Sequence, residues 1–119
     1  MSDAGSMQGT LEELAETMKR LSSPPYGGTL SAWRRFTAAA HADGAVPRKH
    51  KELIAIAISV VKGCERCISY HVRSAAAAGA TDNEIVEAAF VAVIMDGGPA
   101  LAHMGAVLSA IDAHCKGET

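Results

Sequence analysis

The sequence predicts an all-α fold, a single-domain bundle of about six helices. The chain has 119 residues, a length typical of one domain. Apolar residues make up 49% of it, and in most segments they recur at the i, i+3, i+4 spacing of one helix face. Two Thr-x-x-Glu sequences, which are typical of helix starts, and several Gly- or Pro-rich breaks divide the chain into helix-sized segments. These patterns together favour packed helices.

Each predicted helix is bounded by local signals. Residues 1–9 are small and polar and are expected to be disordered, which leaves 10–119 as the helical domain. Capping boxes are predicted at residues 10–13 and 81–84, and Pro47 suits the first position of a third helix. We therefore expect helices at about 10–21, 30–42, 47–62, 64–79, 82–96 and 99–115.

One segment also fits a different structure. Residues 53–61 alternate Ile with Ala and are rich in β-branched side chains, which favours a strand. A strand leading into a CxxC sequence would resemble thioredoxin. However, nothing breaks the chain between Pro47 and Gly63, and no other segment could serve as a partner strand. We therefore predict a helix here, central and buried because it is apolar nearly all round.

Composition excludes several classes of function. The formal net charge is -2, so no basic field is present to attract nucleic acid. No apolar run reaches the ~18 residues of a membrane span, and the N-terminal residues lack the pattern of a signal peptide. Three cysteines do not make a disulfide scaffold in such a chain. We expect a cytoplasmic protein with no nucleic-acid or membrane partner.

The chemistry concentrates in one short stretch. Cys64, Cys67 and His71 lie three and four residues apart, which places them on one face of a helix. Two thiols beside an imidazole suit thiol redox chemistry or metal ligation, and a buried structural cysteine pair is the third alternative. Zinc needs about four ligands including water, of which this set could supply three. Glu52 is a candidate carboxylate for orienting His71, or a salt-bridge partner of a neighbouring lysine.

The remaining histidines and aromatic residues receive weaker predictions. His103, on the last helix, could approach the site. We expect three other histidines and the third cysteine at the surface, and Trp33 and Tyr70 in packing or at an interface. The surface residues are His41, His50, His114 and Cys115. Because the helices are so apolar in so small a chain, further burial between subunits is expected.

The ordered set Glu52, Cys64, Cys67 and His71 resembles that of the alkylhydroperoxidase D-like proteins. These proteins belong to the wider carboxymuconolactone decarboxylase superfamily. The resemblance covers roughly residues 30–112, and further similar stretches lie at 45–53, 77–85 and 95–100. It implies an all-helical subunit in a homo-oligomer, a trimer or a hexamer, and a peroxidase-like reaction without a cofactor.

The resemblance also implies a role for each residue. Cys67 would attack the hydroperoxide, Cys64 would resolve the sulfenic acid into a disulfide, and Glu52 with His71 would relay protons. An external dithiol, a dihydrolipoyl group or a thioredoxin-like protein, would reduce the disulfide. From the residues alone, a helix N-terminus favours Cys64 as the more readily ionised thiol, whereas the nearby His71 favours Cys67.

The chain departs from the fully studied alkylhydroperoxidase type at Arg66, where that type carries a histidine, and it is shorter. Two other functions compete with the thiol-dependent peroxidase or disulfide reductase. One is a non-enzymatic helical assembly module whose CxxC pair senses redox state. The other is a lyase activity like that of the carboxymuconolactone decarboxylases, against which the presence of Cys64 and Cys67 argues.

Overall fold

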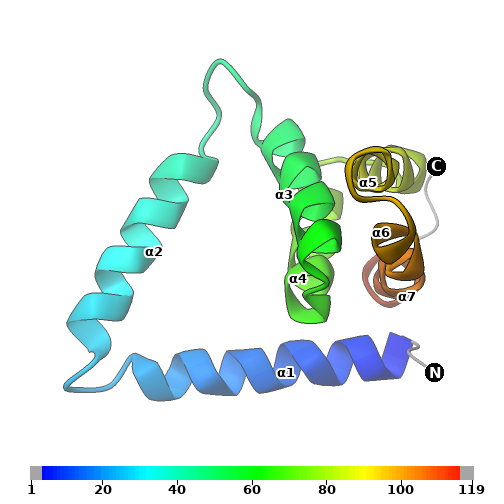
Figure 1. Ribbon diagram of the computed structural model, residues 1–119. Coiled ribbons are helices and arrows are strands. Elements are labelled where there is room, and N and C mark those ends of the chain that lie inside the picture. Colours follow the sequence, from blue (N-terminus) through cyan, green and yellow to red (C-terminus); the bar gives the residue numbers. More distant parts are fainter. Residues whose placement is uncertain (1–3, 116–119) are drawn as a thin grey trace.

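The computed structural model describes residues 4–115, and this part of the chain forms seven helical segments. The all-α prediction is therefore confirmed. The segments are arranged along the chain as shown in Figure 1. Their bounds are α1 Ala4–Leu21, α2 Gly27–His41, α3 Arg48–Lys62, α4 Glu65–Ala77, α5 Asp82–Asp96, α6 Gly98–Ala102 and α7 Met104–His114.

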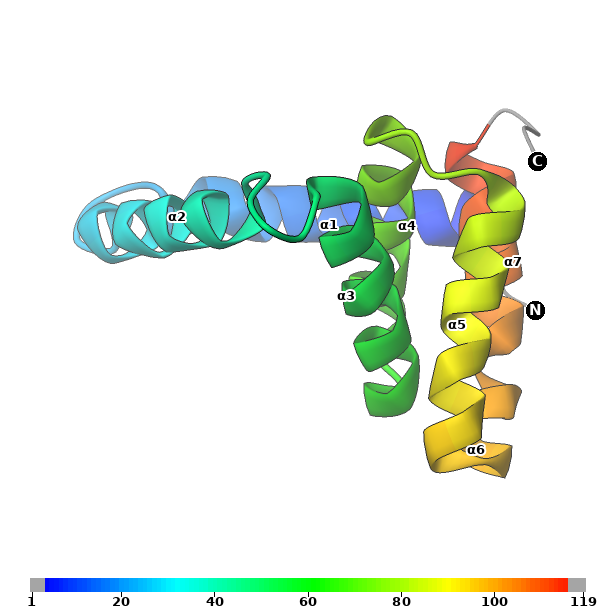
Figure 2. The ribbon, with the colours of Figure 1, turned by 90° about the horizontal axis from the view of Figure 1, so that it is seen from above.

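Helices α3 to α7 pack into one body, and the first two helices frame it. Helix α3 lies between α4 and α5, and α4 also packs on α7. Helix α1 runs across one end of the body against α4 and α7, whereas α2 projects away from it (Figures 1 and 2). No residue of α2 is buried, and this helix meets the body chiefly near its C-terminal end, beside α3.

The core is formed by small and branched apolar side chains. Such short side chains allow the helices to approach closely. Its largest fully buried members come from four helices. They are Ile56 and Val60 of α3, Ile68 and Val72 of α4, Ile85 of α5 and Val107 of α7.

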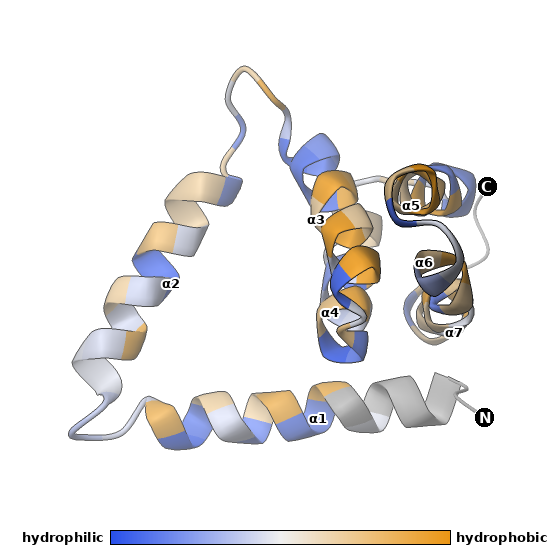
Figure 3. Ribbon diagram, in the orientation of Figure 1, coloured by the Kyte–Doolittle hydropathy of each residue, from blue (hydrophilic) through white to orange (hydrophobic). Residues whose placement is uncertain are grey.

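Residues 53–61 form part of α3, as predicted, but this helix is not buried all round. Ile54, Ile58 and Val61 are 53%, 53% and 44% exposed, whereas Ile56 is fully buried. The exposed residues are four and three positions apart, so they form one stripe on the helix surface. Apolar residues, orange along much of the α3 ribbon in Figure 3, therefore include both buried and exposed ones, and the chain itself covers only one side of this helix.

The predicted start of the first helix is wrong. Helix α1 begins at Ala4, so Thr10 lies inside it and is not its N-cap, and residues 4–9 are helical where disorder was predicted. Gly5, Ser6 and Gly9 are poor helix formers, so local propensity does not explain this start; α1 packs on α4 and α7, and most helical stability in proteins comes from such packing. Residues 1–3 of the predicted disordered segment, and residues 116–119, lie outside the described residues.

The two predictions nearest the C-terminus have different outcomes. The second capping box is present: Thr81 Oγ1 accepts the N–H of Glu84 at 3.1 Å, and Glu84 Oε1 accepts that of Thr81 at 2.9 Å. The last predicted helix is divided at His103 into α6 and α7. There the backbone N–H of His103 donates to the carbonyl of Ala100 at 2.9 Å, a tighter i→i−3 turn than the α-helix makes.

Across residues 4–115, no helix combines the length and the apolar character that a membrane crossing requires.

Candidate active site

A glycine turn brings the two cysteines to the start of α4. Gly63 has a φ of +66°, which favours glycine, and its N–H donates to the carbonyl of Val60 at 3.1 Å. The N–H of Cys64 donates to the carbonyl of Ser59 at 3.2 Å, which completes a Schellman-type end for α3. The ring of His103 packs against this turn, and a Cβ on Gly63 would lie 2.8 Å from its Nε2.

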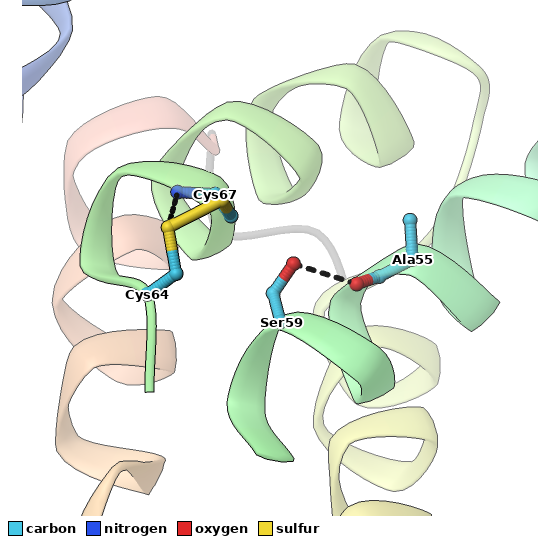
Figure 4. Close-up of a disulfide and its surroundings, with 4 residues drawn as sticks. All are labelled: Ala55, Ser59, Cys64 and Cys67. Atoms are coloured by element: carbon cyan, nitrogen blue, oxygen red, sulfur yellow. Dashed lines mark hydrogen bonds between the residues drawn. A yellow bond between two sulfur atoms is a disulfide. The ribbon is translucent and has the colours of Figure 1, made fainter. Parts of the chain in front are cut away.

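Cys64 and Cys67 are joined by a disulfide across the first turn of α4 (Figure 4). Cys64 is the N-cap residue, and its Sγ accepts the N–H of Cys67 at 3.2 Å. The Cα atoms are 5.3 Å apart, within the normal range for a disulfide. Both cysteines are partly exposed, whereas Ile68 and Ser69, which follow in the same helix, are fully buried. The pair therefore lies at the edge of the core, where reactants have access.

A buried carboxylate of α3 and an imidazole of α4 face each other between these two helices. Glu52 of α3 is only 2% exposed, and its Oε1 lies 2.8 Å from Nδ1 of His71, on α4. An ionised carboxylate only accepts hydrogen bonds, so Nδ1–H of His71 is the donor; in the neutral imidazole, Nε2 then carries the lone pair. Tyr70 packs edge-on against the His71 ring at a centroid distance of 5.1 Å. The structure thus joins Glu52 to His71, one helical turn beyond Cys67.

His41 was predicted to lie at the surface, and this prediction is wrong. Its Nδ1 lies 3.0 Å from Oε2 of Glu52, and its ring stacks on that of His71 at a centroid distance of 5.9 Å. Lys51 holds the end of α2 in place by donating to the carbonyls of Ala40 at 2.9 Å and of Ala42 at 2.6 Å. The position of His41 depends on the path of the loop between α2 and α3, for which the local sequence carries no signal.

The other residues considered from the sequence lie outside this cluster. His50 is exposed, as predicted, but His114 is partly buried and its Nε2 lies 3.0 Å from the hydroxyl of the fully buried Ser69. Burial and, to a smaller extent, the charge of Arg73 lower the pKa of His114. Cys115 is also partly buried, so its predicted surface position is wrong as well.

Two expected interface residues and the unusual arginine are on the outside of this chain. Trp33 is 52% and Tyr70 41% exposed, and Trp33 takes no part in the core. Arg66, between the two cysteines, pairs with Glu13 of α1 at 2.6 Å. The ion pair therefore links α1 to the CxxC turn, and both side chains remain at least half exposed.

Within residues 4–115, no group of three or more His, Cys, Asp or Glu side chains is arranged to hold a metal ion. A cavity of about 500 Å³ lies at the other end of α4. Its lining includes Arg73, Thr81 and His114 but no member of the Glu52, His71 and cysteine cluster. The cluster therefore lies away from this cavity.

The fold and the site define a class: an all-helical protein with a carboxylate–imidazole pair next to a CxxC disulfide. The pattern of the carboxymuconolactone decarboxylase family matches residues 27–110, and the chain belongs to this family, within the alkylhydroperoxidase D-like superfamily.

Similar sequences and solved structures agree with this assignment. A Paracoccus denitrificans protein named uncharacterized protein 4 in cox locus is 44% identical over 71 residues, which are 60% of this chain and 64% of that protein. A Cupriavidus necator protein is 36% identical over 84 residues, 71% of this chain and 74% of its own.

Among solved structures, a carboxymuconolactone decarboxylase family protein from Legionella pneumophila superposes with a TM-score of 0.87 at 29% identity. The match covers 92% of this chain and 97% of that one. A Thermotoga maritima family member, described with a possible involvement in antioxidative response, has a TM-score of 0.74 at 25% identity, over 87% of each chain.

Proposed function

We propose that this protein is a thiol-dependent peroxidase or disulfide reductase that works through Cys64 and Cys67. The observation that carries the proposal is the hydrogen bond from His71 to the buried Glu52, next to a CxxC pair that forms a disulfide. A carboxylate on Nδ1 orients an imidazole and makes its other nitrogen a better base. The antioxidative description of the Thermotoga relative supports the same function.

The reaction follows from the chemistry of the four groups. In the reduced protein, His71 takes the proton of the Cys67 thiol, and Glu52 stabilises the imidazolium. The thiolate attacks one peroxide oxygen, so that an S–O bond forms, the O–O bond breaks and the leaving alkoxide takes the proton from His71. The products are an alcohol and a sulfenic acid on Cys67.

The second half of the cycle returns the protein to the observed disulfide. The Cys64 thiol attacks the sulfur of Cys67, the S–O bond breaks, and water leaves with the thiol proton. An external dithiol, a dihydrolipoyl group or a thioredoxin-like protein, then opens the disulfide in two exchange steps and is itself oxidised. Two electrons pass from the dithiol to the hydroperoxide, so that no cofactor is needed.

The order of the two thiols is tested by trapping the sulfenic acid. Cys67 is the proposed attacking residue because it precedes His71 by one helical turn, while Cys64 is the N-cap residue. With peroxide and a sulfenic-acid trap, the Cys64→Ser variant should be labelled and the Cys67→Ser variant should not. Labelling of the Cys67→Ser variant alone reverses the assignment.

The activity itself is tested by peroxide-dependent oxidation of a dithiol by the purified protein. Wild type should turn over several hydroperoxides, and Cys67→Ser should not. Cys115→Ser is the matched control, because it also removes one thiol but leaves the disulfide intact. Equal rates for wild type and Cys67→Ser would refute the proposal. A lyase activity on a carboxymuconolactone-like substrate, in contrast, would survive replacement of both cysteines.

We also propose that the chain acts as a homo-oligomer, a trimer or a hexamer. The support is the number of large apolar side chains that this chain leaves exposed, and a helix, α2, that buries no residue. On α5, which packs on α3, Ile94 and Met95 are 78% and 79% exposed, in addition to the exposed stripe of α3. Sedimentation under reducing and oxidising conditions measures the mass. A mass that changes with redox state, without turnover, would favour the redox-sensing module.

A further inference from the structure

A second histidine reaches the buried carboxylate from a different helix. Oε1 of Glu52 accepts the hydrogen bond from His71, and its other oxygen, Oε2, lies 3.0 Å from Nδ1 of His41. This contact lacks the angles of a hydrogen bond, and Nδ1 of His41 is buried without any hydrogen-bond partner. A buried ring nitrogen without a partner is unusual and requires an explanation.

The charges around Glu52 show why the second oxygen matters. A carboxylate that is 2% exposed is stable as an anion only where charged or hydrogen-bonding groups face it. Besides His41, Arg48 faces Oε2; its Nε is 3.9 Å away and its side chain is 55% exposed. Lys51 is directed to the carbonyls on either side of His41 and so secures its position.

The two oxygens of a carboxylate move together, because they rotate about one carbon–carbon bond. A group that restrains Oε2 therefore also restrains Oε1 and the hydrogen bond to His71. We propose that His41 is a positioning residue of the Glu52–His71 pair, which fixes the plane of the carboxylate from its second oxygen. Helix α2, which buries no residue, then contributes to the site through its last residue.

This inference rests on the proposed function only in that the Glu52–His71 pair relays the proton of Cys67. Its first test therefore requires no measurement of turnover. In the disulfide form at alkaline pH, nitrogen NMR reports which ring nitrogen of His71 carries the proton. His41→Phe keeps a stacking ring but no nitrogen, and it should decrease the Nδ1–H tautomer of His71. His41→Asn places an amide nitrogen near the Nδ1 position and should restore the tautomer. The exposed His50→Asn is the control. An unchanged tautomer in His41→Phe overturns the proposal.

The second test is a double-mutant cycle on the reduced protein. Alkylation of Cys67 by iodoacetamide and its oxidation by hydroperoxide should both slow by about threefold to tenfold in His41→Phe, the effect of losing one interaction with a charged group. In the Glu52→Gln background, the same substitution should change neither rate by more than about twofold. Equal losses in both backgrounds would mean that His41 does not act through Glu52, and would overturn the proposal.

The outcomes separate this inference from the proposed function. If wild type shows no peroxide turnover but alkylation still depends on His41 through Glu52, the peroxidase proposal fails and the positioning role stands. If wild type turns over peroxide but His41→Phe has equal effects with and without Glu52→Gln, the peroxidase proposal stands and the positioning role fails. Thermal melting accompanies each variant, and His41→Asn supplies the comparison should His41→Phe fail to fold.

Discussion

Replacing Gly63 with alanine should destabilise the protein by two separable effects. The backbone of Gly63 has a φ of +66°, a conformation in which an L-residue costs about 1–2 kcal/mol. The added Cβ would also lie 2.8 Å from Nε2 of His103, closer than side-chain carbons approach other atoms. Crowding of this kind in packed regions costs about 1–3 kcal/mol. We therefore expect Gly63→Ala to lower the free energy of unfolding by about 2–5 kcal/mol in total.

A double-mutant cycle with His103→Ala separates the two effects. Once the imidazole is removed, only the backbone strain remains, so the cost of Gly63→Ala should fall to about 1–2 kcal/mol. Alanine also restricts the unfolded chain relative to glycine, but this contribution is the same in both backgrounds and cancels from the coupling energy. The coupling energy therefore measures the contact between the turn and the ring alone.

The measurement is urea unfolding at one fixed protein concentration, because association contributes to the stability of an oligomer. The midpoint should change with an unchanged m-value. A coupling energy near zero would show that the ring of His103 moves away freely and does not support the CxxC turn. A Gly63→Ala variant as stable as wild type would contradict the left-handed conformation itself.

Three further predictions concern the surroundings of the site. Thr81→Ala should lower the free energy of unfolding, measured with urea, by about 1 kcal/mol, because both halves of the capping box with Glu84 are formed. Thr81→Ser keeps the hydroxyl and should retain most of this stability. Arg66→Ala should change stability by at most about 1 kcal/mol, because its ion pair is exposed; a larger loss would mean that it secures α1 to α4. Burial and then Arg73 lower the pKa of His114 below its ordinary 6.5, so stability should be complete above that pH and decline as pH falls through the lowered value. His114→Gln should flatten this decline in thermal melts, and an unchanged slope would contradict the assignment.

The sequence predicted correctly which side chains lie close together where they belong to neighbouring helices. Glu52 and His71 belong to two helices that are joined by a single glycine turn, so their approach follows from helical periodicity and one tight connection. Gly63 marks that turn because only glycine adopts its backbone conformation easily. The periodicity of 53–61 was ambiguous between strand and helix. The absence of a break between Pro47 and Gly63 favoured a helix, which is what the structure has.

The predictions that proved wrong concern residues whose positions depend on distant parts of the chain. The place of His41 is set by the angle between α2 and α3 across the connecting loop, and no local pattern encodes that angle. Similarly, the capping signal at Thr10 did not mark the helix start, because α1 packs on α4 and α7 and such tertiary packing is not encoded in the local sequence. The half-exposed α3 was predicted as buried because composition does not tell which apolar stripe the same chain covers and which it leaves uncovered.

The uncovered stripe and the extra histidine have related consequences for the site. Hydrogen bonds from Lys51 of α3 hold the C-terminal end of α2. A helix of 15 residues without buried side chains gains little stability from its own sequence. If subunit association fixes α2, it also fixes His41 against Glu52, and the reactivity of Cys67 then depends on assembly. Dilution below the dissociation threshold should in that case lower the alkylation rate of wild type but not of His41→Phe, for which the link between α2 and the carboxylate is already broken.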